Sequence, residues 1–450
     1  KMQLQLTTDY LKKITRLIAK KDGNVLRDLL HEVHFADIAE LLEELKPEEA
    51  AYLIKSLESE ITSEALMELD EDDREKILSY LSPKEIAKEI EEMDTDDAAD
   101  VVAELDEYIQ KKVIEIIKDE EHASDIVELL TYDNDTAGAL MAKELVQVKE
   151  TWTVASCVRE MRRQAENVTR VHSIYVTDKD GKLKGRLSLK DLLTATAKTH
   201  ISEIYIAKVD YVTVATEDEE VARIMRKYDL EAIPVVDENG VLVGRITIDD
   251  IVDFIKEEAE KDYQMAAGIS QDVEADDSIL ELTKARLPWL VLGLFGGLGS
   301  VYILQGFEEA LFHYPILFFF TPLIAAMAGN VGVQSTAIIV QGLANDVVKG
   351  SLFHRLLKEL GLALINGSIL GLLVILFGLI VGQDFIVSIT IAISMLTVII
   401  IAALIGTFVP IILDRKGIDP AIATGPFITT SNDIFGIFLF FYIAKLILGF

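Results

Sequence analysis

An acidic residue stands inside an apolar segment near the C-terminal end of the chain. Asp433 lies in the stretch GPFITTSNDIFGIFLFFYIAKLILGF, residues 425–450, which is long and apolar enough to form a membrane helix. A charged side chain costs about 2.5–3.5 kcal/mol at the centre of such a helix, so it marks a functional site by default. Hydroxyl and amide oxygens precede it at residues 429–432. The segment therefore predicts a polar site at membrane depth, where such groups are tolerated if they line a cavity.

A second polar cluster lies within another apolar run. The sequence AGNVGVQST, residues 328–336, contributes Asn330, Gln334, Ser335 and Thr336. One interpretation is helix–helix packing, in which small residues let helices approach and polar groups bond locally. The alternative is a cavity, because polar groups and irregular backbone are tolerated at membrane depth where they line one. The polar groups cluster in two runs and accompany an acid, which favours the cavity.

Apolar runs of membrane-spanning length fill the C-terminal part, at about residues 287–306, 315–344, 357–381, 386–413 and 424–448. Two of the connections between them are basic, with Lys349, Arg355, Lys358, Arg415 and Lys416, and the other two carry Glu308, Glu309 and Asp384. Positive loops stay on the cytoplasmic side of a membrane. We therefore predict a multi-pass protein of the cell membrane with its N-terminal domains in the cytoplasm and its C-terminus outside.

The charge of the chain is concentrated in its N-terminal part. Residues 286–450 carry a net charge of −1, which leaves −31 of the total −32 on residues 1–285. So acidic a surface argues against nucleic acid as a partner and permits divalent cations. The chain has one cysteine, no CxxC or HxxxH pair and no GxxxxGK[ST] loop, so the sequence predicts neither a zinc site nor ATP hydrolysis through that loop.

Residues 34–117 repeat with a period of 12, from HFADIAELLEEL to DEYIQKKVIEII. Each unit has an apolar residue at its ninth and twelfth positions, such as Leu42 and Leu45, and this spacing places both on one helix face. Acids, serine or proline open most units, where helices prefer to start. The pattern predicts short helices stacked into a superhelix. One long helix is the alternative, and Pro47 and Pro83 at unit starts argue against it.

A second repeat follows at an offset of 59 residues. IYVTDKDGKLKGRLSLKDLL (174–193) matches IPVVDENGVLVGRITIDDIV (233–252), and each copy predicts strand, turn, strand and helix. The pair resembles tandem CBS domains over about residues 135–258. In such pairs the aspartate of the last motif often holds the ribose of an adenine nucleotide, and Asp191 and Asp250 occupy that position. The alternative is that both aspartates only cap helices.

An acidic helical stretch, DDIVDFIKEEAEKDYQMAAG at 249–268, leads from the second copy toward the membrane part. Asp249, Asp253, Glu257 and Glu260 share one face at helical spacing. Such a stripe is usually a solvated face. Because this stretch lies between the acidic N-terminal part and the apolar C-terminal part, it also suits a helix that connects the two.

Four motifs together give the chain a resemblance to the MgtE family of magnesium channels and transporters. They are DNDTAGALM (133–141), GNVGVQS, GIDPAIATGP (417–426) and TTSNDIFG (429–436). Ala328–Gly329 replaces the family's double glycine before the asparagine, and Gly138–Ala139 replaces another glycine pair; neither change removes a charge. The resemblance implies a multidomain fold: an all-α acidic superhelix (1–134), an α/β tandem CBS pair (135–258), an acidic linking helix (259–285) and an all-α membrane domain of five transmembrane helices (286–450).

The resemblance also implies a homodimer in membrane lipid, with the pore on its two-fold axis and Asp433 binding the permeating Mg²⁺. The regulatory Mg²⁺ ligands that it implies, matched by motif, are Glu64, Asp96, Asp100, Glu217, Glu219, Asp229, Asp250, Asp253, Glu258, Asp262 and Asp419. The CBS resemblance predicts ATP or a related adenine nucleotide as a further ligand, bound to the first CBS copy with its ribose at Asp191. Repulsion between acidic faces that Mg²⁺ bridges gives a physical basis for closure at high cytosolic Mg²⁺.

Other classes of protein remain as alternatives. A transporter of Co²⁺, Mn²⁺ or Ni²⁺ with the same architecture shares every feature above. A nucleotide-sensing membrane receptor with a CBS pair would need an output domain, and a CBS-containing exporter of the kind we know has its spans before the CBS pair. An enzyme is the weakest alternative, because the spans carry no nucleophile–base pair or zinc ligand set. We therefore predict a magnesium channel or transporter and no enzymatic activity.

Overall fold

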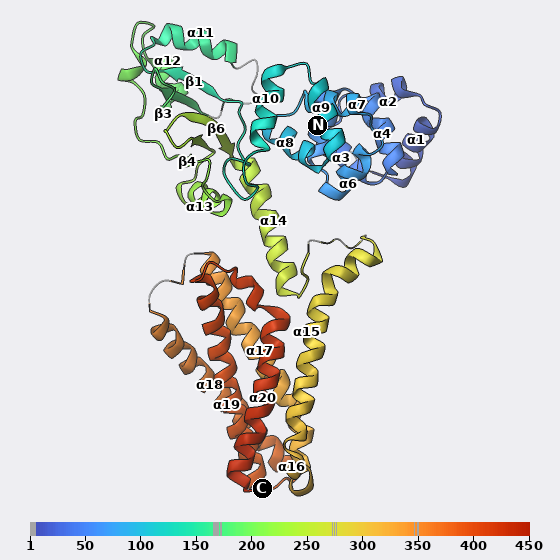
Figure 1. Cartoon of the computed structure of the whole chain (residues 1–450), viewed down its shortest axis with the longest axis vertical. Helices are drawn as coiled ribbons and strands as arrows, with labels where there is room; N and C mark the ends of the chain where they lie inside the picture. Colours follow the sequence, from blue (N-terminus) through green and yellow to red (C-terminus); the bar gives the residue numbers. More distant parts are fainter. Residues whose placement is uncertain are drawn as a thin grey trace. The chain divides into compact units, whose positions relative to one another are not determined.

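The computed structural model describes residues 6–164, 171, 173–271, 273, 275, 277–345, 347–348 and 351–450. The predicted contributions of Lys349 to loop charge and of residues 272, 274 and 276 to the acidic linker lie outside these residues. The chain divides into an N-terminal unit, Lys1–Phe254, and a C-terminal unit, Ile255–Phe450 (Figure 1).

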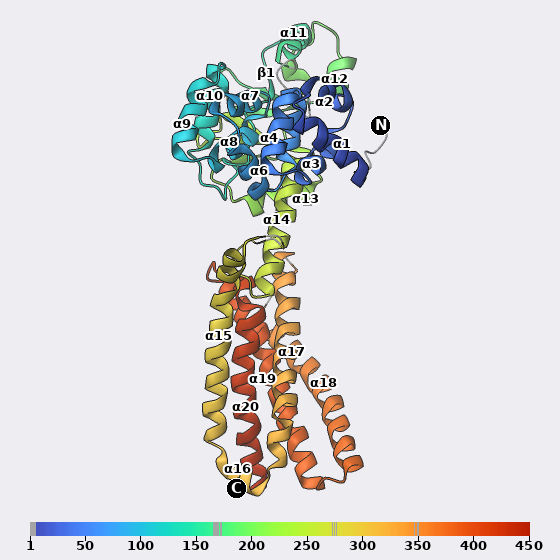
Figure 2. The same cartoon turned by 90° about the vertical axis from the view of Figure 1, so that its right-hand side faces the viewer.

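Ten short helices open the described part of the N-terminal unit: α1 (Thr8–Ala19), α2 (Gly23–Leu30), α3 (Phe35–Glu43), α4 (Pro47–Ser56), α5 (Ser59–Met67), α6 (Glu71–Leu78), α7 (Pro83–Ile90), α8 (Thr95–Glu104), α9 (Glu107–Ile116) and α10 (Glu120–Leu129). Each 12-residue unit forms one helix and its cap. In α7, for example, Ser82 and Glu85 form a capping box and Pro83 takes the first helical position. Second neighbours pack together, α3 on α5 and α4 on α6, which makes a superhelix of two helical rows (Figure 2).

The predicted apolar positions form the core of this superhelix. The ninth residues from Leu42 to Val102 are buried, as are the twelfth residues from Leu45 to Met93, while Leu105 and Ile114 at the end of the repeat are partly buried. The prediction of stacked short helices is therefore confirmed. The stacking also extends beyond the repeat, because α1, α2 and α10 continue the two rows.

Two copies of a small α/β fold follow. The first has β1 (Val146–Lys149), α11 (Val154–Gln164), β2 (Ile174–Thr177), β3 (Leu183–Leu187) and α12 (Leu189–Thr194); the second has β4 (Val212–Thr213), α13 (Asp218–Tyr228), β5 (Ala232–Val236), β6 (Leu242–Thr247) and α14 (Ile248–Ala266). The 3₁₀ turn η1 (Ile201–Glu203) lies between them. In each sheet the first strand is parallel to the second and the third is antiparallel to it. The copies meet at their turns, where Leu183 N donates to Gly240 O and Leu242 N to Gly181 O.

The linking helix differs from its predicted bounds of 259–285. It starts at Ile248, directly after β6, and ends at Ala266, because Gly268 takes a positive φ of 79° that terminates the helix. The next helix begins only at Ile279, where Ser278 and Glu281 form a capping box. The first span is correspondingly longer than residues 287–306.

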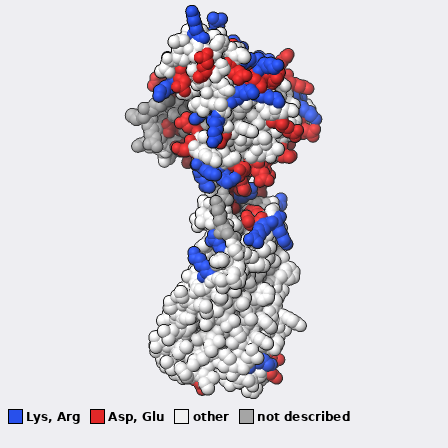
Figure 3. Space-filling view, turned by 90° about the vertical axis from the view of Figure 1, so that its left-hand side faces the viewer, with Lys and Arg blue, Asp and Glu red and all other residues white. Residues whose placement is uncertain are grey.

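The C-terminal unit contains α15 (Ile279–Gln305), α16 (Glu308–His313), α17 (Ile316–Ala344), α18 (Leu352–Val381), α19 (Phe385–Asp414), the 3₁₀ turn η2 (Pro420–Ala423) and α20 (Gly425–Leu448). Among the described residues, five helical segments are long and apolar enough to cross a membrane, as predicted. Helix α19 packs against α17, α18 and α20, so it forms the centre of the bundle (Figure 2). Figure 3 shows a broad face of this unit without charged side chains, which suits contact with lipid.

Candidate functional site

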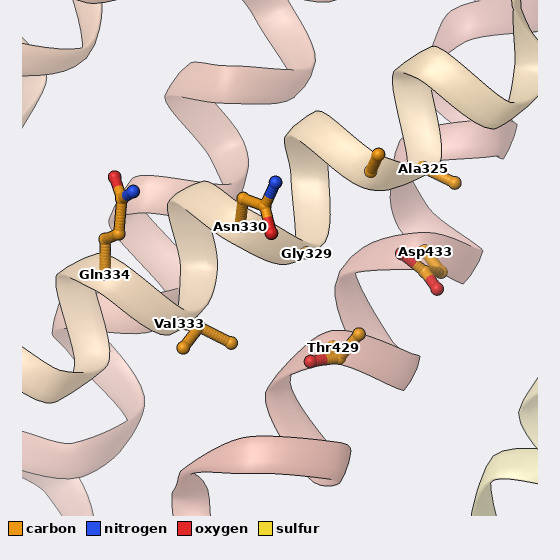
Figure 4. Close-up of a pocket in the computed structure, with 8 residues that line it drawn as sticks. Ala325, Gly329, Asn330, Val333, Gln334, Thr429 and Asp433 are labelled. Atoms are coloured by element: carbon orange, nitrogen blue, oxygen red, sulfur yellow. The ribbon is translucent and has the colours of Figure 1, made fainter.

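Asp433 lines a cavity between α17 and α20. The cavity has a volume of about 390 Å³, and its lining residues are Ala325, Ala326, Gly329, Asn330, Val333, Gln334, Thr429 and Asp433 (Figure 4). Thr429 and Asp433 stand one turn apart on α20, and Asn330 and Gln334 stand one turn apart on α17. The two helices therefore present a carboxylate, a hydroxyl and two amides to one space, a donor set that suits a hydrated divalent cation.

Glycine at position 329 keeps Asp433 accessible from the cavity. A Cβ at Gly329 would lie 3.2 Å from Thr429 Cγ2 and 3.5 Å from Asp433 Oδ1. Any longer side chain there would cover the carboxylate. The absence of a side chain on α17 is thus what gives this carboxylate room for an ion.

Three other polar residues of the two clusters bond to or pack against neighbouring helices. Ser335 donates to Glu359 Oε1 on α18 at 2.6 Å, and Thr336 donates to the carbonyl of Gly406 on α19 at 3.0 Å. Asn432 is buried against Gly332, where a Cβ would lie 1.8 Å from the amide nitrogen. Both interpretations of the polar clusters therefore apply to part of them. Asn330, Gln334 and Thr429 line the cavity. The residues that pack helices together are Ser335, Thr336 and Asn432.

A group of acids lies where α8 of the superhelix meets the second α/β copy. We call it the acidic seam; it comprises Asp94, Asp96, Asp97, Asp100, Glu64, Glu144 and Asp250. Burial raises the pKa of Asp96 well above its ordinary value, and the charges of Asp97 and Asp250 raise it further. Burial together with the charges of Asp250, Asp100, Asp94 and Glu64 raises the pKa of Asp97 to about 8. These carboxylates are thus crowded and poorly hydrated, and a cation nearby would relieve them.

Hydrogen bonds fix the two sides of the seam. Burial raises the pKa of Asp250, although its carboxylate accepts from Thr247 N at 2.9 Å and from Thr247 Oγ1 at 2.6 Å, which opposes the shift. Across from it, Glu144 accepts from the Thr95 hydroxyl at 2.8 Å at the start of α8. The helix-cap interpretation therefore holds for Asp250.

The structure places the predicted regulatory residues in several groups. It brings Glu64, Asp96, Asp100 and Asp250 into the seam, and Asp253 is exposed one turn after Asp250 on α14. Glu217 caps the start of α13 with Glu219 in its first turn, whereas Asp229 caps the other end of the same helix, roughly 16 Å away. Asp191 lies in the first turn of α12, where the preceding cap residue Ser188 makes no side-chain cap hydrogen bond.

The remaining predicted residues lie where the linking helix reaches the membrane helices. Desolvation and the charges of Asp419 and Glu258 raise the pKa of Asp262, and Glu258 also pairs with Lys261 at 2.7 Å. A Cβ on Gly425, at the start of α20, would lie 2.3 Å from the carbonyl oxygen of Ala266, the last residue of α14. The end of the linking helix therefore contacts the helix that carries Asp433.

Within the described residues, no three His, Cys, Asp or Glu side chains converge closely enough to hold a metal ion on their own. Sequence reasoning also missed Asp94, Asp97 and Glu144 of the seam and the Ser335–Glu359 pair. The signal that could have indicated Asp94 and Asp97 is the acidic run DTDDAAD, which opens one of the 12-residue units. Glu144 follows shortly after the DNDTAGALM motif.

This architecture defines a class: multi-pass membrane proteins with an acidic regulatory unit built from a helical superhelix and a CBS pair. Residues 321–443 match the family model MgtE, a divalent cation transporter, residues 33–135 match the MgtE intracellular N domain, and residues 137–198 and 201–257 match the CBS domain. The magnesium transporter MgtE of Bacillus subtilis is 35% identical over 316 residues, 70% of each chain. That of Thermus thermophilus is 37% identical over 320 residues, 70% of this chain and 71% of the relative. The chain belongs to the MgtE family.

Solved structures resemble the N-terminal unit. The cytosolic domain of the Mg²⁺ channel MgtE in complex with ATP superposes with a TM-score of 0.51 at 35% identity, covering 54% of this chain and 99% of that structure. The soluble part of a magnesium transporter gives a TM-score of 0.50 at 30% identity, covering 56% and 98%. The predicted superhelix, CBS pair and membrane helices are thus all confirmed as fold assignments.

Proposed function

We propose that this chain is a magnesium channel or transporter in which Mg²⁺ passes the cavity at Asp433. The observation that carries the proposal is this carboxylate, which shares an open cavity with Asn330, Gln334 and Thr429 on the surface of an apolar bundle. Mg²⁺ dehydrates reluctantly and is usually bound by one or two carboxylates with its waters retained. A cavity that offers one carboxylate and several neutral oxygens suits an ion of this kind.

The working unit is a homodimer in membrane lipid. The cavity lies on one side of the helix pair α17 and α20, and a second copy across a two-fold axis would supply a second Asp433 and close the path. The basic connections between the spans support an orientation with the N-terminal unit in the cytoplasm and Phe450 outside. The MgtE relatives are named magnesium transporters, which supports Mg²⁺ as the cargo.

Uptake into proteoliposomes tests the transport proposal. Asp433→Asn removes the charge at nearly constant volume, so we expect Mg²⁺ influx to fall to the level of empty vesicles. Asp384→Asn is the matched control, because Asp384 caps α19 through Ile386 N and asparagine caps equally well. Wild-type influx through Asp433→Asn would remove the cavity from the path. Competition by Co²⁺, Mn²⁺ and Ni²⁺ in the same assay decides between magnesium and the wider group of divalent cations.

Cytosolic Mg²⁺ closes the pore by neutralising the acids of the N-terminal unit and the linking helix. Like charges about 4 Å apart repel by roughly 1–4 kcal/mol at effective dielectric constants of 80 to 20, and a bridging cation reverses this. The proposed ligands in the seam and on α14 are Glu64, Asp96, Asp100, Asp250, Asp253, Glu258 and Asp262, with Asp419 in the membrane loop and Glu217, Glu219 and Asp229 on α13. Because no three of these acids, all of which the structure describes, converge on a single point in one chain, each Mg²⁺ is completed by water molecules or by acids of the second subunit of the dimer.

Alanine at Asp96, Asp100, Asp250 and Asp253 tests this gate. We expect currents in membrane patches to persist at millimolar cytosolic Mg²⁺, where the wild type closes. An unchanged inhibition curve would show that these acids form an ordinary solvated surface. Asp433→Asn, in contrast, abolishes the current at every Mg²⁺ concentration, so the two sets of variants separate gating from permeation.

ATP binds the first CBS copy, with its ribose at Asp191. The equivalent Asp250 is committed to hydrogen bonds with Thr247, whereas Ser188 beside Asp191 makes no such cap. The solved MgtE cytosolic domain in complex with ATP supports the same ligand here. Titration calorimetry of Asp191→Ala against the wild type tests the assignment, and equal heats for the two proteins would exclude Asp191 as a ligand.

A further inference from the structure

The superhelix shares its hydrophobic core with the second CBS copy rather than with the first. One continuous cluster joins superhelix residues such as Val101 and Val102 to Val221, Ile246 and Ile251 of the second copy. The first copy, although it follows the superhelix directly in sequence, has a separate core. The superhelix and the second copy are therefore packed together through one hydrophobic core.

The connection between them is made by the segment that follows α10. Ala137 N donates to Thr216 O and Gly138 N donates to Val214 O, so this segment runs along the edge of the second copy. A Cβ at Gly138 would lie 2.6 Å from the Tyr132 ring, which explains the glycine. The segment continues to Glu144 in the seam.

Arg245 lies at the end of this connection, beside the acids. Its side chain is 7% exposed, and its backbone pairs with Ala142 in both directions, at 2.9 and 2.8 Å. The guanidinium donates from Nε to the carbonyl of Glu144 and from Nη2 to Asp94 Oδ2 at 3.3 Å, at the cap of α8. A single buried cation thus links β6 of the second copy, the connecting segment and the superhelix.

The repeat supplies a natural comparison. Arg186 occupies the same place in the first copy, in GRLSL against GRITI, and it is exposed. A buried guanidinium is expensive unless it is paired and fully hydrogen-bonded, so the burial of Arg245 among acids is a specific arrangement.

We propose that Arg245 is a built-in cation of the acidic seam: it holds α8 on the second CBS copy when no divalent ion is bound, and so sets the Mg²⁺ concentration at which the seam closes. The proposal rests on the Mg²⁺ gating described above. Arg245 is a positioning residue that acts through Asp94. Without its charge the seam acids repel without compensation, and Mg²⁺ must supply the missing cation.

The test measures protection of the full-length protein against a protease at increasing Mg²⁺, without nucleotide, in detergent. For Arg245→Gln we expect the half-protecting Mg²⁺ concentration to rise about tenfold, the usual consequence of losing one hydrogen bond to a charged group. Arg245→Lys keeps the charge and should stay within threefold of the wild type. Arg186→Gln is the matched control and should stay within twofold.

A second readout separates a charge role from a merely structural one. The thermal midpoint of the N-terminal unit should fall in Arg245→Gln without Mg²⁺, and saturating Mg²⁺ should remove most of the deficit. A deficit that persists in saturating Mg²⁺, a lysine variant that behaves like the glutamine variant, or an unshifted Mg²⁺ curve for Arg245→Gln would each overturn the proposal. Absence of Mg²⁺ protection in the wild type would instead overturn the gating on which it rests.

Discussion

Neutralising Asp97 should stabilise the N-terminal unit at high pH. The pKa of this carboxyl is about 8 in the folded protein against an ordinary value of 3.8. The folded state therefore binds a proton at Asp97 more tightly than the unfolded state, so the contribution of Asp97 to stability is most favourable below about pH 4 and is lost as the pH rises from about 4 to about 8. Above pH 8 the cost is complete, because the carboxylate is then ionised in both states.

The size of this cost follows from the same two values. At 1.36 kcal/mol for each pH unit, the difference corresponds to roughly 5–6 kcal/mol as an upper bound. Asp97→Asn removes the ionisation but also an acid in the first turn of α8, which loses about 0.3–1 kcal/mol of favourable interaction with the helix dipole. Because screening by solvent reduces the gain well below its upper bound, we expect a net stabilisation of about 2 kcal/mol at pH 8.5.

Calorimetry of the full-length protein in detergent, without divalent cations, measures the effect. For a unit of this size about 2–4 °C accompany each kcal/mol, so the thermal midpoint of Asp97→Asn should exceed that of the wild type by roughly 5 °C at pH 8.5. The difference should shrink as the pH is lowered and vanish at about pH 4, where the carboxyl is protonated in both states. Glu115→Gln, at an exposed position on α9, is the control and should change nothing. A midpoint that is unchanged or lowered at pH 8.5 would refute the account of the seam as a strained cluster of acids.

Two further predictions concern the membrane helices. Gly332→Ala should abolish transport and lower the yield of protein, because its Cβ would lie 1.8 Å from the amide of the buried Asn432. Gly361→Ala is the control and should leave Mg²⁺ uptake unchanged, because its Cβ would meet no heavy atom within 4 Å. Equal uptake by the two variants would contradict the close packing at Gly332. Gly425→Ala should uncouple gating from the pore, because its Cβ would lie 2.3 Å from Ala266 O and its φ is +51°. Currents in membrane patches should then resist cytosolic Mg²⁺, while Mg²⁺ still protects the N-terminal unit against protease. Normal inhibition by Mg²⁺ would argue against this contact as the link between the N-terminal unit and the pore.

The sequence predicts those parts of the molecule whose signals are local. The 12-residue period predicts the superhelix because each unit carries its own helix cap and its own two buried positions. Hydropathy predicts the membrane helices because each apolar run is by itself long enough to span the bilayer. The acidic helical stretch predicted at 249–268 coincides with α14, whereas the bounds 259–285 given to the linking helix as a domain run across a break between two helices. Gly268 on one side of this break and the Ser278–Glu281 capping box on the other are its local signals.

The acidic seam could not be predicted in full, because it depends on contacts that are distant in sequence. Asp94, Glu144 and Asp250 meet only because the superhelix packs on the second CBS copy, and the internal repeat gives no reason to prefer that copy over the first. The membrane clusters show the same limit. The residue types indicated polar groups at membrane depth. Only the orientation of the helices shows that Asn330 lines the cavity while Ser335 forms a hydrogen bond to another helix.

In the gating that we propose, helix α14 is the connection between the acidic seam and the membrane helices. Its first turn carries Asp250, held in the acidic seam, and its last residue, Ala266, meets Gly425 at the start of α20. The 19 residues between Ile248 and Ala266 contain neither glycine nor proline, so the helix has no built-in point at which to kink. Asp433 lies eight residues beyond Gly425, about 12 Å along the same helix. The gating that we propose therefore depends on the contact of Ala266 with Gly425, which Gly425→Ala tests directly.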